Sequence, residues 1–302
     1  MRIVSLLSSA TEIVHLLGLQ DRLVGISHEC DFPPESLDRP RVSRVRFDPA
    51  GLDSAGIDAA VRGAMERFGS VYEIDADLLR ALEPDLVLTQ AVCEVCAVPT
   101  GSVREVVDAL PDPPLVVSLD AHTIAGILQT IRQVADAAGE PARGEEAVGK
   151  LGARLRRVDE AIAGRPRPRV LLLEWLDPPF LPGHWVPEMV AAAGGLCLVG
   201  EAGRRSLETD WDTLAGRDPD VLLVEPCGYD LPRALEDGGR FRERLRTVAP
   251  RALEQGAAWA LDSALFSRSG PRVVAGVEAL AAVFHPDLFP NSWTRGVAAR
   301  LP

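Results

Sequence analysis

The stretch "GEPARGEEAVGKLGARLRRVDEAIAGRPRPR" (residues 139–169) decides how this chain is organised. Its apolar residues recur at steps of three and four, and Pro141 and Gly164 mark the two ends of the pattern. The apolar stripe consists of Val148, Leu151, Leu155, Val158 and Ile162. This spacing predicts one helix of about 22 residues, about 33 Å long at the usual rise per residue. Such a helix favours a rigid crossover between two halves of the chain over a flexible linker.

The sequences on either side of this helix follow the same plan. Short apolar runs alternate with helical patterns, which is typical of β/α layers with parallel strands. "EPDLVLTQ" (83–90) is mirrored by "DPDVLLVEP" (218–226), and "LVVSLD" (115–120) by "AWALDS" (258–263). We predict an α/β fold of two Rossmann-like lobes with parallel sheets, joined by a single long helix, with the ligand cleft between the lobes. The expected boundaries are 1–139 for the N-terminal lobe, 140–164 for the connecting helix and 165–302 for the C-terminal lobe.

The secondary structure of the first half can be predicted element by element. Ser9 and Glu12 have the spacing of a capping box, and Gly18 is a stop signal for the helix between them. We expect strands at 2–7, 22–26, 85–90 and 115–119 and helices at 9–17, 55–67, 76–82, 102–109 and 122–138.

Composition narrows the class of protein. The chain has 302 residues, of which 47% are apolar and 25% charged, as in a soluble globular protein with a sizeable core. A net charge of −12 disfavours sequence-independent binding to nucleic acid or anionic lipid.

The N-terminus does not have the pattern of a signal peptide, because Glu12 and His15 interrupt its apolar run. No stretch reaches the length of a membrane span, so we expect no direct insertion into a membrane. As written, the chain is predicted to be cytoplasmic, with reduced thiols. It would be periplasmic or surface-exposed if the true start lies upstream.

Chemically distinctive residues gather just beyond the predicted strand ends. Four of the five cysteines, two of the five histidines and two of the five tryptophans are found there. Ligands of open parallel sheets bind beyond the carboxyl ends of the strands, so we expect these residues to line a ligand site. The candidates are Ser8, Ser9, His28, Glu29, Cys30, Gln90, Cys93, Cys96, Glu174, Trp175, His184, Trp185, Cys227, Phe266 and Arg268.

Two other uses of these residues stay open. A metal site holding Zn²⁺ or an iron–sulfur cluster has candidate ligands in His28, Cys30, Cys93, Cys96 and Cys227. A cytoplasmic redox enzyme could use Cys93 and Cys96 as a dithiol, or His28 with Glu29 in acid–base chemistry. The sequence has no glycine-rich phosphate loop, nucleophile elbow or His-Glu-x-x-His motif, so we do not predict an enzyme.

Three motifs carry a resemblance to a known family. The segments are "RIVSLLSSATEIVHLLGLQDRLVGISHECDFPP" (2–34), "GHWVPEMVAAAGG" (183–195) and "FSRSGPR" (266–272). With "EPDLVLTQ", they resemble the vitamin B12/iron-siderophore family of ABC-transporter substrate-binding proteins, and most of all its cobalamin-binding members. The resemblance implies two lobes on one long helix, little hinge motion, and a ligand held between the lobes.

The resemblance makes a corrinoid, with cobalamin as its best single name, the expected ligand of a non-catalytic protein. A broad cleft with apolar and aromatic walls suits a flat macrocycle, and His28, His184 or a thiolate could approach its cobalt. Siderophore or haem binding stays open. The resemblance also implies docking to an ABC permease through one surface carboxylate on each lobe. The candidates are Glu94 or Glu105 in the first lobe and Glu208, Asp210 or Asp212 in the second.

Overall fold

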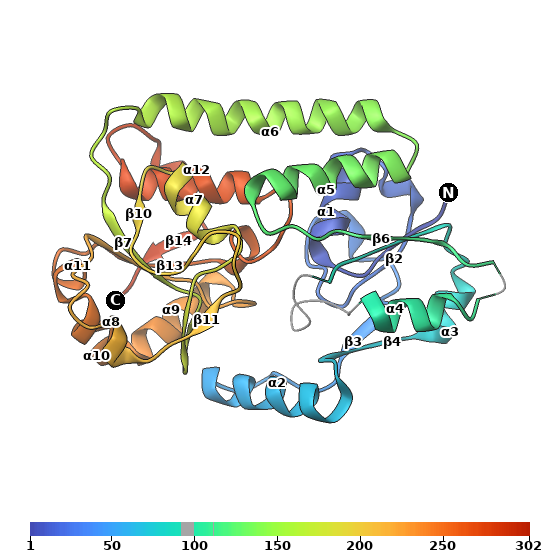
Figure 1. The fold of residues 1–302 in the computed structure, drawn as a ribbon, viewed down its shortest axis with the longest axis horizontal. Coiled ribbons are helices and arrows are strands. Elements are labelled where there is room, and N and C mark those ends of the chain that lie inside the picture. The colour runs from blue at the N-terminus through green and yellow to red at the C-terminus, as the bar shows by residue number, and fades with distance from the viewer. Residues whose placement is uncertain (92–99, 111) are drawn as a thin grey trace. The chain divides into compact units, whose positions relative to one another are not determined.

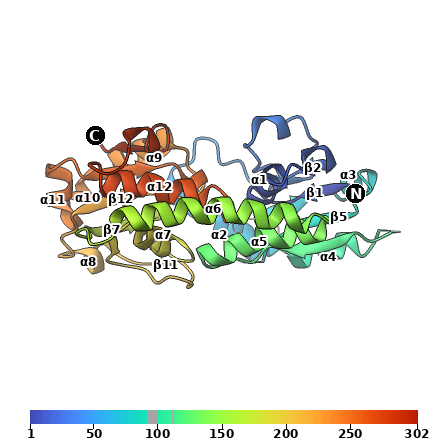
Figure 2. The ribbon, with the colours of Figure 1, turned by 90° about the horizontal axis from the view of Figure 1, so that it is seen from above.

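The computed structural model describes residues 1–91, 100–110 and 112–302, which divide into two compact units. Unit 1 consists of Met1–Leu52, Ala59–Ala121 and Ala125–Lys150, and unit 2 of Asp53–Asp58, His122–Ile124 and Leu151–Pro302. The long helix predicted from its apolar stripe is confirmed as α6 (Pro141–Ile162). It is one uninterrupted helix of 22 residues (Figure 2), and the division into units falls within it.

Unit 1 contains a parallel sheet with the strand order β2-β1-β5-β6 (Figure 1). Its strands are β1 (Ile3–Ser5), β2 (Leu23–Ile26), β5 (Leu86–Thr89) and β6 (Leu115–Ser118). These are the four strands expected from the apolar runs of the first half. Ile3 lies opposite both Leu23 and Leu86, so β1 is covered by a strand on each side. The side chains of β1 and β5 are fully buried, which explains why these strands are continuous apolar runs.

The helices of unit 1 also follow the sequence pattern. They are α1 (Ser8–Leu16), α2 (Ser54–Phe68, whose first residues belong to unit 2), α3 (Ala76–Ala81), α4 (Thr100–Val107) and α5 (Ile124–Ala137), with short 3₁₀ turns η1 (Gln20–Arg22) and η2 (Pro34–Ser36). The capping-box prediction was wrong, because α1 begins at Ser8 and Leu7 is its N-cap without a side-chain bond. The stop at Gly18 is confirmed: its φ is +68°, and its N–H donates to His15 O at 2.9 Å.

Two strands of unit 1 were not predicted. β3 (Ser43–Val45) and β4 (Tyr72–Ile74) form a separate antiparallel pair, with Ser43 opposite Ile74 and Val45 opposite Tyr72. Each has three residues, too few for an alternating pattern to be recognised. Their pairing is nevertheless important, since it brings Ser43 and Tyr72 beside one of the predicted site residues.

Unit 2 contains a second sheet, with the order β10-β7-β12-β13-β14. Its strands are β7 (Arg169–Leu173), β10 (Leu196–Cys197), β12 (Val221–Val224), β13 (Ala258–Leu261) and β14 (Ala298–Arg300). β7, β12 and β13 are the predicted apolar runs and pair in parallel, whereas β14 is antiparallel to β13 and was not predicted. A small antiparallel sheet was also missed, made of β8 (Trp175–Leu176), β9 (Pro179–Leu181) and β11 (Leu207–Glu208).

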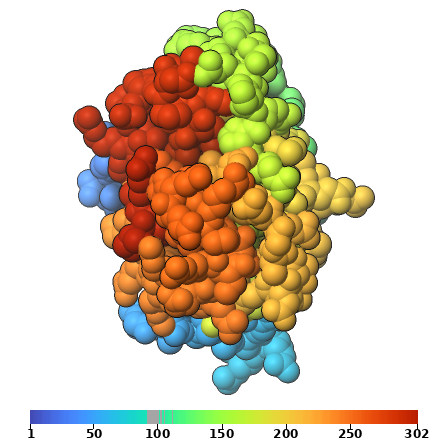
Figure 3. All heavy atoms as spheres, turned by 90° about the vertical axis from the view of Figure 1, so that its left-hand side faces the viewer, coloured from blue at the N-terminus to red at the C-terminus, as the bar shows by residue number. Residues whose placement is uncertain are grey.

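The helices of unit 2 cluster in its later part. They are α7 (Val186–Ala192), α8 (Trp211–Leu214), α9 (Leu231–Arg240), α10 (Arg242–Val248), α11 (Pro250–Glu254) and α12 (Val273–Phe284), with 3₁₀ turns η3 (Ser263–Leu265) and η4 (Asn291–Trp293). Figure 3 shows the face of this unit on which α10 and α11 (orange) and α12 with the C-terminal residues (red) lie. None of the helices in the described ranges is both long and apolar enough to cross a membrane.

Arginines on α6 fix this helix to each unit separately. In unit 1, Arg143 donates to the carbonyl oxygens of Leu17 and Gly18 at 3.1 and 3.0 Å. In unit 2, Arg154 forms a two-pronged ion pair with Glu278 of α12, at 2.9 and 2.6 Å. A bidentate pair of this kind fixes orientation as well as distance.

The core of unit 2 is centred on the middle strands of its sheet. Leu222 of β12 is fully buried, lies between β7 and β13, and packs with Leu171 and Leu245. Replacing Leu222 with Ala should therefore lower the free energy of unfolding by about 2–5 kcal/mol, since the cavity adds to the lost transfer energy. Chemical denaturation of Leu222→Ala measures this loss.

The matched control is Leu207→Ala in β11, because the Leu207 side chain is 61% exposed. This variant should unfold within about 0.5 kcal/mol of the unsubstituted chain. Equal destabilisation by the two substitutions would contradict this account of the core.

Candidate functional site

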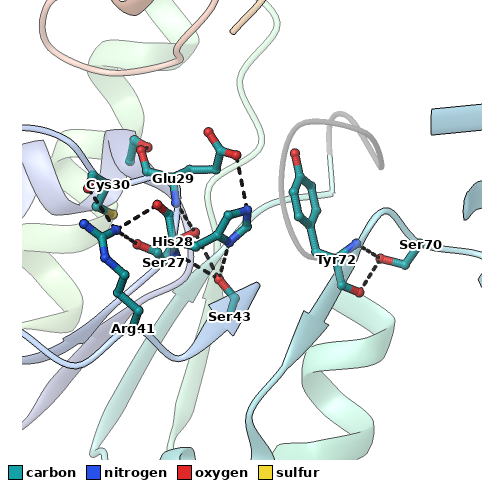
Figure 4. A network of polar contacts seen from close by, with 9 residues as sticks. Ser27, His28, Glu29, Cys30, Arg41, Ser43, Ser70 and Tyr72 are labelled. Carbon is teal, nitrogen blue, oxygen red and sulfur yellow. Dashed lines mark hydrogen bonds and ion pairs between the residues drawn. The ribbon is translucent and has the colours of Figure 1, made fainter. Parts of the chain in front are cut away.

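The first candidate site lies at the end of β2 in unit 1 (Figure 4). After Ile26 the chain turns through Ser27, His28 and Cys30, and one guanidinium nitrogen of Arg41 holds this turn. Arg41 Nη1 donates to the carbonyl oxygens of all three turn residues, at 3.2, 2.7 and 3.1 Å in chain order. Three bonds from one cation fix the backbone of the turn and so the direction in which its side chains leave it.

The imidazole of His28 is held on three sides. Nδ1 lies 2.8 Å from Ser43 Oγ, and Nε2 lies 3.2 Å from Glu29 Oε1. The ring is tilted by 47° against the ring of Tyr72, with 4.9 Å between centroids. The His28 side chain is 17% exposed and that of Glu29 is 46% exposed. The ring is thus oriented by β3 and β4, and its Nε2, which faces Glu29, is buried.

The neighbouring predicted residues are more deeply buried. Ser8 Oγ donates to Glu29 O at 2.6 Å, which ties the start of α1 to the turn. Cys30 is 1% exposed, and its Sγ lies 3.1 Å from Thr11 Oγ1. The Cys30 thiol is therefore packed against α1 and does not face an open metal site. Ser9 and Gln90 are also buried, at 4% and 7% exposure.

A second candidate site lies where β7 and β12 end in unit 2. These strands are neighbours in parallel register, and the residue after each of them is a glutamate. Glu174 accepts a bond from Gly183 N–H at 3.1 Å and one from Ser206 Oγ at 2.5 Å. Glu225 accepts from Ser267 Oγ at 2.5 Å and is completely buried.

Burial governs the chemistry of Glu225. Loss of solvent raises the pKa of its carboxyl well above the usual range, and the nearby Glu174 and Cys227 raise it further. One of its two oxygens, Oε2, has no hydrogen-bond partner in the described part of the chain. We did not predict Glu225 as a site residue. Its position directly after an apolar run, like that of Glu174, is the signal that could have identified it.

Aromatic residues lie beside this second site. The edge of the Trp175 ring meets Tyr229 at 5.1 Å between centroids, and Trp175 Nε1 donates to Asp177 O at 3.1 Å. The Cys227 side chain is exposed. Arg268 follows η3 and is partly buried.

Two further predicted contacts are buried in unit 2. Trp185 is 6% exposed, and its Nε1 donates to Phe266 O at 2.5 Å. Phe266 is fully buried. This bond joins the N-cap of α7 to the residue that follows η3.

His184, by contrast, has a close partner that we did not predict. Its Nδ1 lies 3.2 Å from Nδ1 of His122, a residue of the segment His122–Ile124 that belongs to unit 2. Burial lowers the pKa of His184, and the charges of His122 and Arg205 lower it further. His122 follows the predicted strand at 115–119, as His28 follows the strand at 22–26, so the same strand-end signal could have revealed it.

The structure does not assemble the predicted metal site from the residues that it describes. His28 and Cys30 belong to unit 1 and Cys227 to unit 2. Within residues 1–91, 100–110 and 112–302, no three His, Cys, Asp or Glu side chains are placed to hold one metal ion. Cys93, Cys96 and Glu94 lie outside the described residues, as does the side chain of Glu105. Of the docking candidates, Asp210 caps α8 through Thr213 N–H at 2.7 Å.

The two sheets and their strand-end residues are those of an α/β binding protein. The family described as "Periplasmic binding protein" matches residues 3–247, and the chain belongs to this family. The predicted resemblance and fold class are confirmed.

Similar proteins extend over most of the chain. The vitamin B12-binding protein of Vibrio cholerae serotype O1 (strain O395) is 22% identical over 281 residues, or 92% of this chain and 86% of the relative. An uncharacterized ABC transporter substrate-binding lipoprotein of Bacillus subtilis (strain 168) is 23% identical, covering 95% and 81%. The crystal structure of a periplasmic heme-binding protein from Pseudomonas aeruginosa aligns with a TM-score of 0.75 at 23% identity, covering 100% and 99%.

These names refine two of the expectations. They support ligand binding as the general activity, with vitamin B12 and haem both represented. They do not support the cytoplasmic location, since the relatives are called periplasmic or lipoprotein.

The Ser43 hydroxyl organises the first site, and its removal should be measurable. Ser43→Ala leaves the His28 N–H, the His28 ring and Ser27 Oγ without the partner that they share. Because Ser43 is buried, we expect the free energy of unfolding to fall by about 1–3 kcal/mol. We also expect the ¹⁵N resonances of the His28 ring to shift. The exposed Ser292→Ala is the control, and unchanged His28 resonances in Ser43→Ala would contradict this geometry.

The raised pKa of Glu225 makes a signed prediction about stability. A carboxyl whose pKa is higher in the folded than in the unfolded state binds a proton on folding. The Glu225 carboxyl therefore contributes most to the free energy of unfolding at pH values below its pKa in the unfolded chain. This contribution is lost as the pH rises through its pKa in the folded protein. Glu225→Gln should therefore gain stability over the unsubstituted chain as the pH rises from about 5 to about 8. Urea denaturation at each pH measures the free energy of unfolding of both proteins, and Glu236→Gln, at an exposed position, is the control. If the free energies of Glu225→Gln and of the unsubstituted chain changed in parallel with pH, the burial of this carboxyl would be contradicted.

Proposed function

We propose that this chain binds a corrinoid, with cobalamin as the best single ligand, and that it does so without catalysing a reaction. The relative named vitamin B12-binding protein supports this proposal over 92% of the chain. The family supports binding rather than catalysis as the activity. We further propose that the protein works outside the cytoplasmic membrane and delivers its ligand to an ABC permease, as the name of the B. subtilis relative suggests.

The observation that carries the proposal is the fixed imidazole of His28. With Nδ1 bonded to Ser43, Nε2 is the nitrogen left for a ligand: it is buried, makes no hydrogen bond in the described part of the chain, and lies 3.2 Å from Glu29 Oε1. Imidazole is a good ligand for cobalt and for iron. Glu29 is the group nearest to Nε2, and since it is half exposed, it can turn into solvent when a ligand approaches.

The proposed contact residues come from strand ends of both units. Beside His28, we retain Ser8, Ser9, Glu29, Gln90 and Cys93 from the first half of the chain, and Trp175, His184 and Arg268 from the second. Phe266 and the thiol of Cys30 are left out because they are 0% and 1% exposed, whereas Trp185, at 6%, is retained because Ser8 is exposed to the same extent. A ligand held between two lobes would need both sets at once, and that arrangement is part of the proposal.

Haem is the second candidate, favoured by the likeness to the P. aeruginosa heme-binding structure. The charge of the second site argues for the corrinoid. Haem carries two propionates, whereas the rim of cobalamin carries neutral amides that donate hydrogen bonds. The negative charge of a carboxylate such as Glu174 would repel propionates and would not repel neutral amides.

A competitive binding experiment tests the proposal. Purified protein is titrated with hydroxocobalamin, hemin and a ferric siderophore, and absorbance is followed in the visible range. We expect saturation at one equivalent of hydroxocobalamin, and at least tenfold weaker binding by His28→Ala, about 1.4 kcal/mol. His15→Ala is the matched control, because His15 bonds to Ser36 on a different surface of unit 1.

Each alternative result has a distinct meaning. If hemin bound more tightly than hydroxocobalamin, haem and not a corrinoid would be the ligand of this protein. Binding of cobalamin that His28→Ala leaves unchanged would remove His28 from the site. No binding of any of the three compounds would refute the proposed function.

A further inference from the structure

Two histidines of unit 2 face each other through their Nδ1 atoms, at hydrogen-bond distance. The Nδ1 atoms of His122 and His184 are 3.2 Å apart, with the ring centroids separated by 5.4 Å and the planes inclined at 27°. His122 is exposed and His184 is partly buried, so dissolved ions can reach the pair from one side. Both histidines belong to unit 2, whereas His28 belongs to unit 1.

The backbone holds His184 in an unusual conformation. Its φ is +50°, in the left-handed region that residues with a side chain rarely occupy. Its N–H donates to Arg204 O at 2.5 Å, and its carbonyl accepts from Gly203 N–H at 2.7 Å. Gly183 is packed so tightly that a Cβ there would lie 2.3 Å from Ser206 N. The loop at 203–206 thus fixes the direction in which the His184 ring leaves the chain, and such constraint is typical of functional positions.

A separate contact positions His122. The N–H of Ile124, two residues later, donates to Glu188 Oε2 at 2.7 Å. Glu188 lies in the first turn of α7, and His184 lies just before that helix. The two rings are therefore brought together by independent attachments to the same region of unit 2.

We propose that His122 and His184 bind one divalent first-row transition-metal ion, of the zinc or nickel type, through their Nδ1 atoms. Zinc–nitrogen bonds are about 2.0–2.1 Å long, so two ligands at a tetrahedral angle stand about 3.3–3.4 Å apart. The observed separation is close to this value. Water completes the coordination, since no third His, Cys, Asp or Glu of the described residues is placed to join. A site with two protein ligands should bind in the micromolar range and exchange readily.

Metal binding requires both Nδ1 atoms to be unprotonated, with the ring protons on Nε2. Arg205 lies near enough to His184 to act on it electrostatically. Arg205 also repels a bound cation, which makes the affinity of the site sensitive to that residue.

Metal titration of the full chain, without any corrinoid or haem, tests the proposal. Isothermal calorimetry with Zn²⁺ and with Ni²⁺ near neutral pH should show one equivalent bound. His122→Gln and His184→Gln should each weaken binding at least tenfold, and His15→Gln should leave it unchanged. Arg205→Ala should bind the ion more tightly, a gain that loss of folding cannot imitate.

Several outcomes would overturn the inference. These are no metal uptake by the unsubstituted chain, or uptake that the two histidine variants leave intact. A thiolate charge-transfer band with Co²⁺ that persists in His122→Gln would place the metal on cysteine instead. Because the assay contains no tetrapyrrole, its result is independent of the cobalamin titration, and either proposal can fail while the other stands.

Discussion

Parallel strand pairing is the constraint on which the candidate sites depend. Neighbouring parallel strands end at the same edge of a sheet, so residues far apart in sequence become neighbours there. In unit 1, this places the start of α1 after β1 beside the turn after β2, where Ser8 bonds to Glu29. In unit 2, it places Glu174 beside Glu225. Both sites result from the register of two buried strands.

At these shared sheet edges, turns with a fixed backbone set the direction in which the side chains point. Arg41 holds the turn that carries His28, and the loop at 203–206 holds His184. In each case, bonds to main-chain atoms set where an imidazole lies. Glu225 is instead defined by its burial. Ser267 bonds to one oxygen of its carboxyl, and the loss of solvent favours the neutral form of this group.

Sequence reasoning succeeded where a residue pattern has a local cause. The stripe from Val148 to Ile162 could form only one long amphipathic helix, and the buried runs of β1, β5, β7 and β12 could be little other than strands. It failed for β3, β4 and β14, which are too short to show a period and are held by their partners. The capping box failed because the N-cap of α1 is Leu7, two residues before the Ser9 that the motif suggested.

The sequence by itself determined the α/β class, the long helix, and the placement of His28 and Glu174 after apolar runs, because local periodicity and strand-end position can be read along the chain. Only the tertiary structure decided which of these residues have partners. Ser43 and Tyr72 reach His28 through a strand pair remote in sequence, and His122 reaches His184 across 62 residues. Likewise, only packing showed that Phe266 and the thiol of Cys30 are buried. Long-range pairing and solvent exclusion arise only when the chain packs, and no local pattern specifies them.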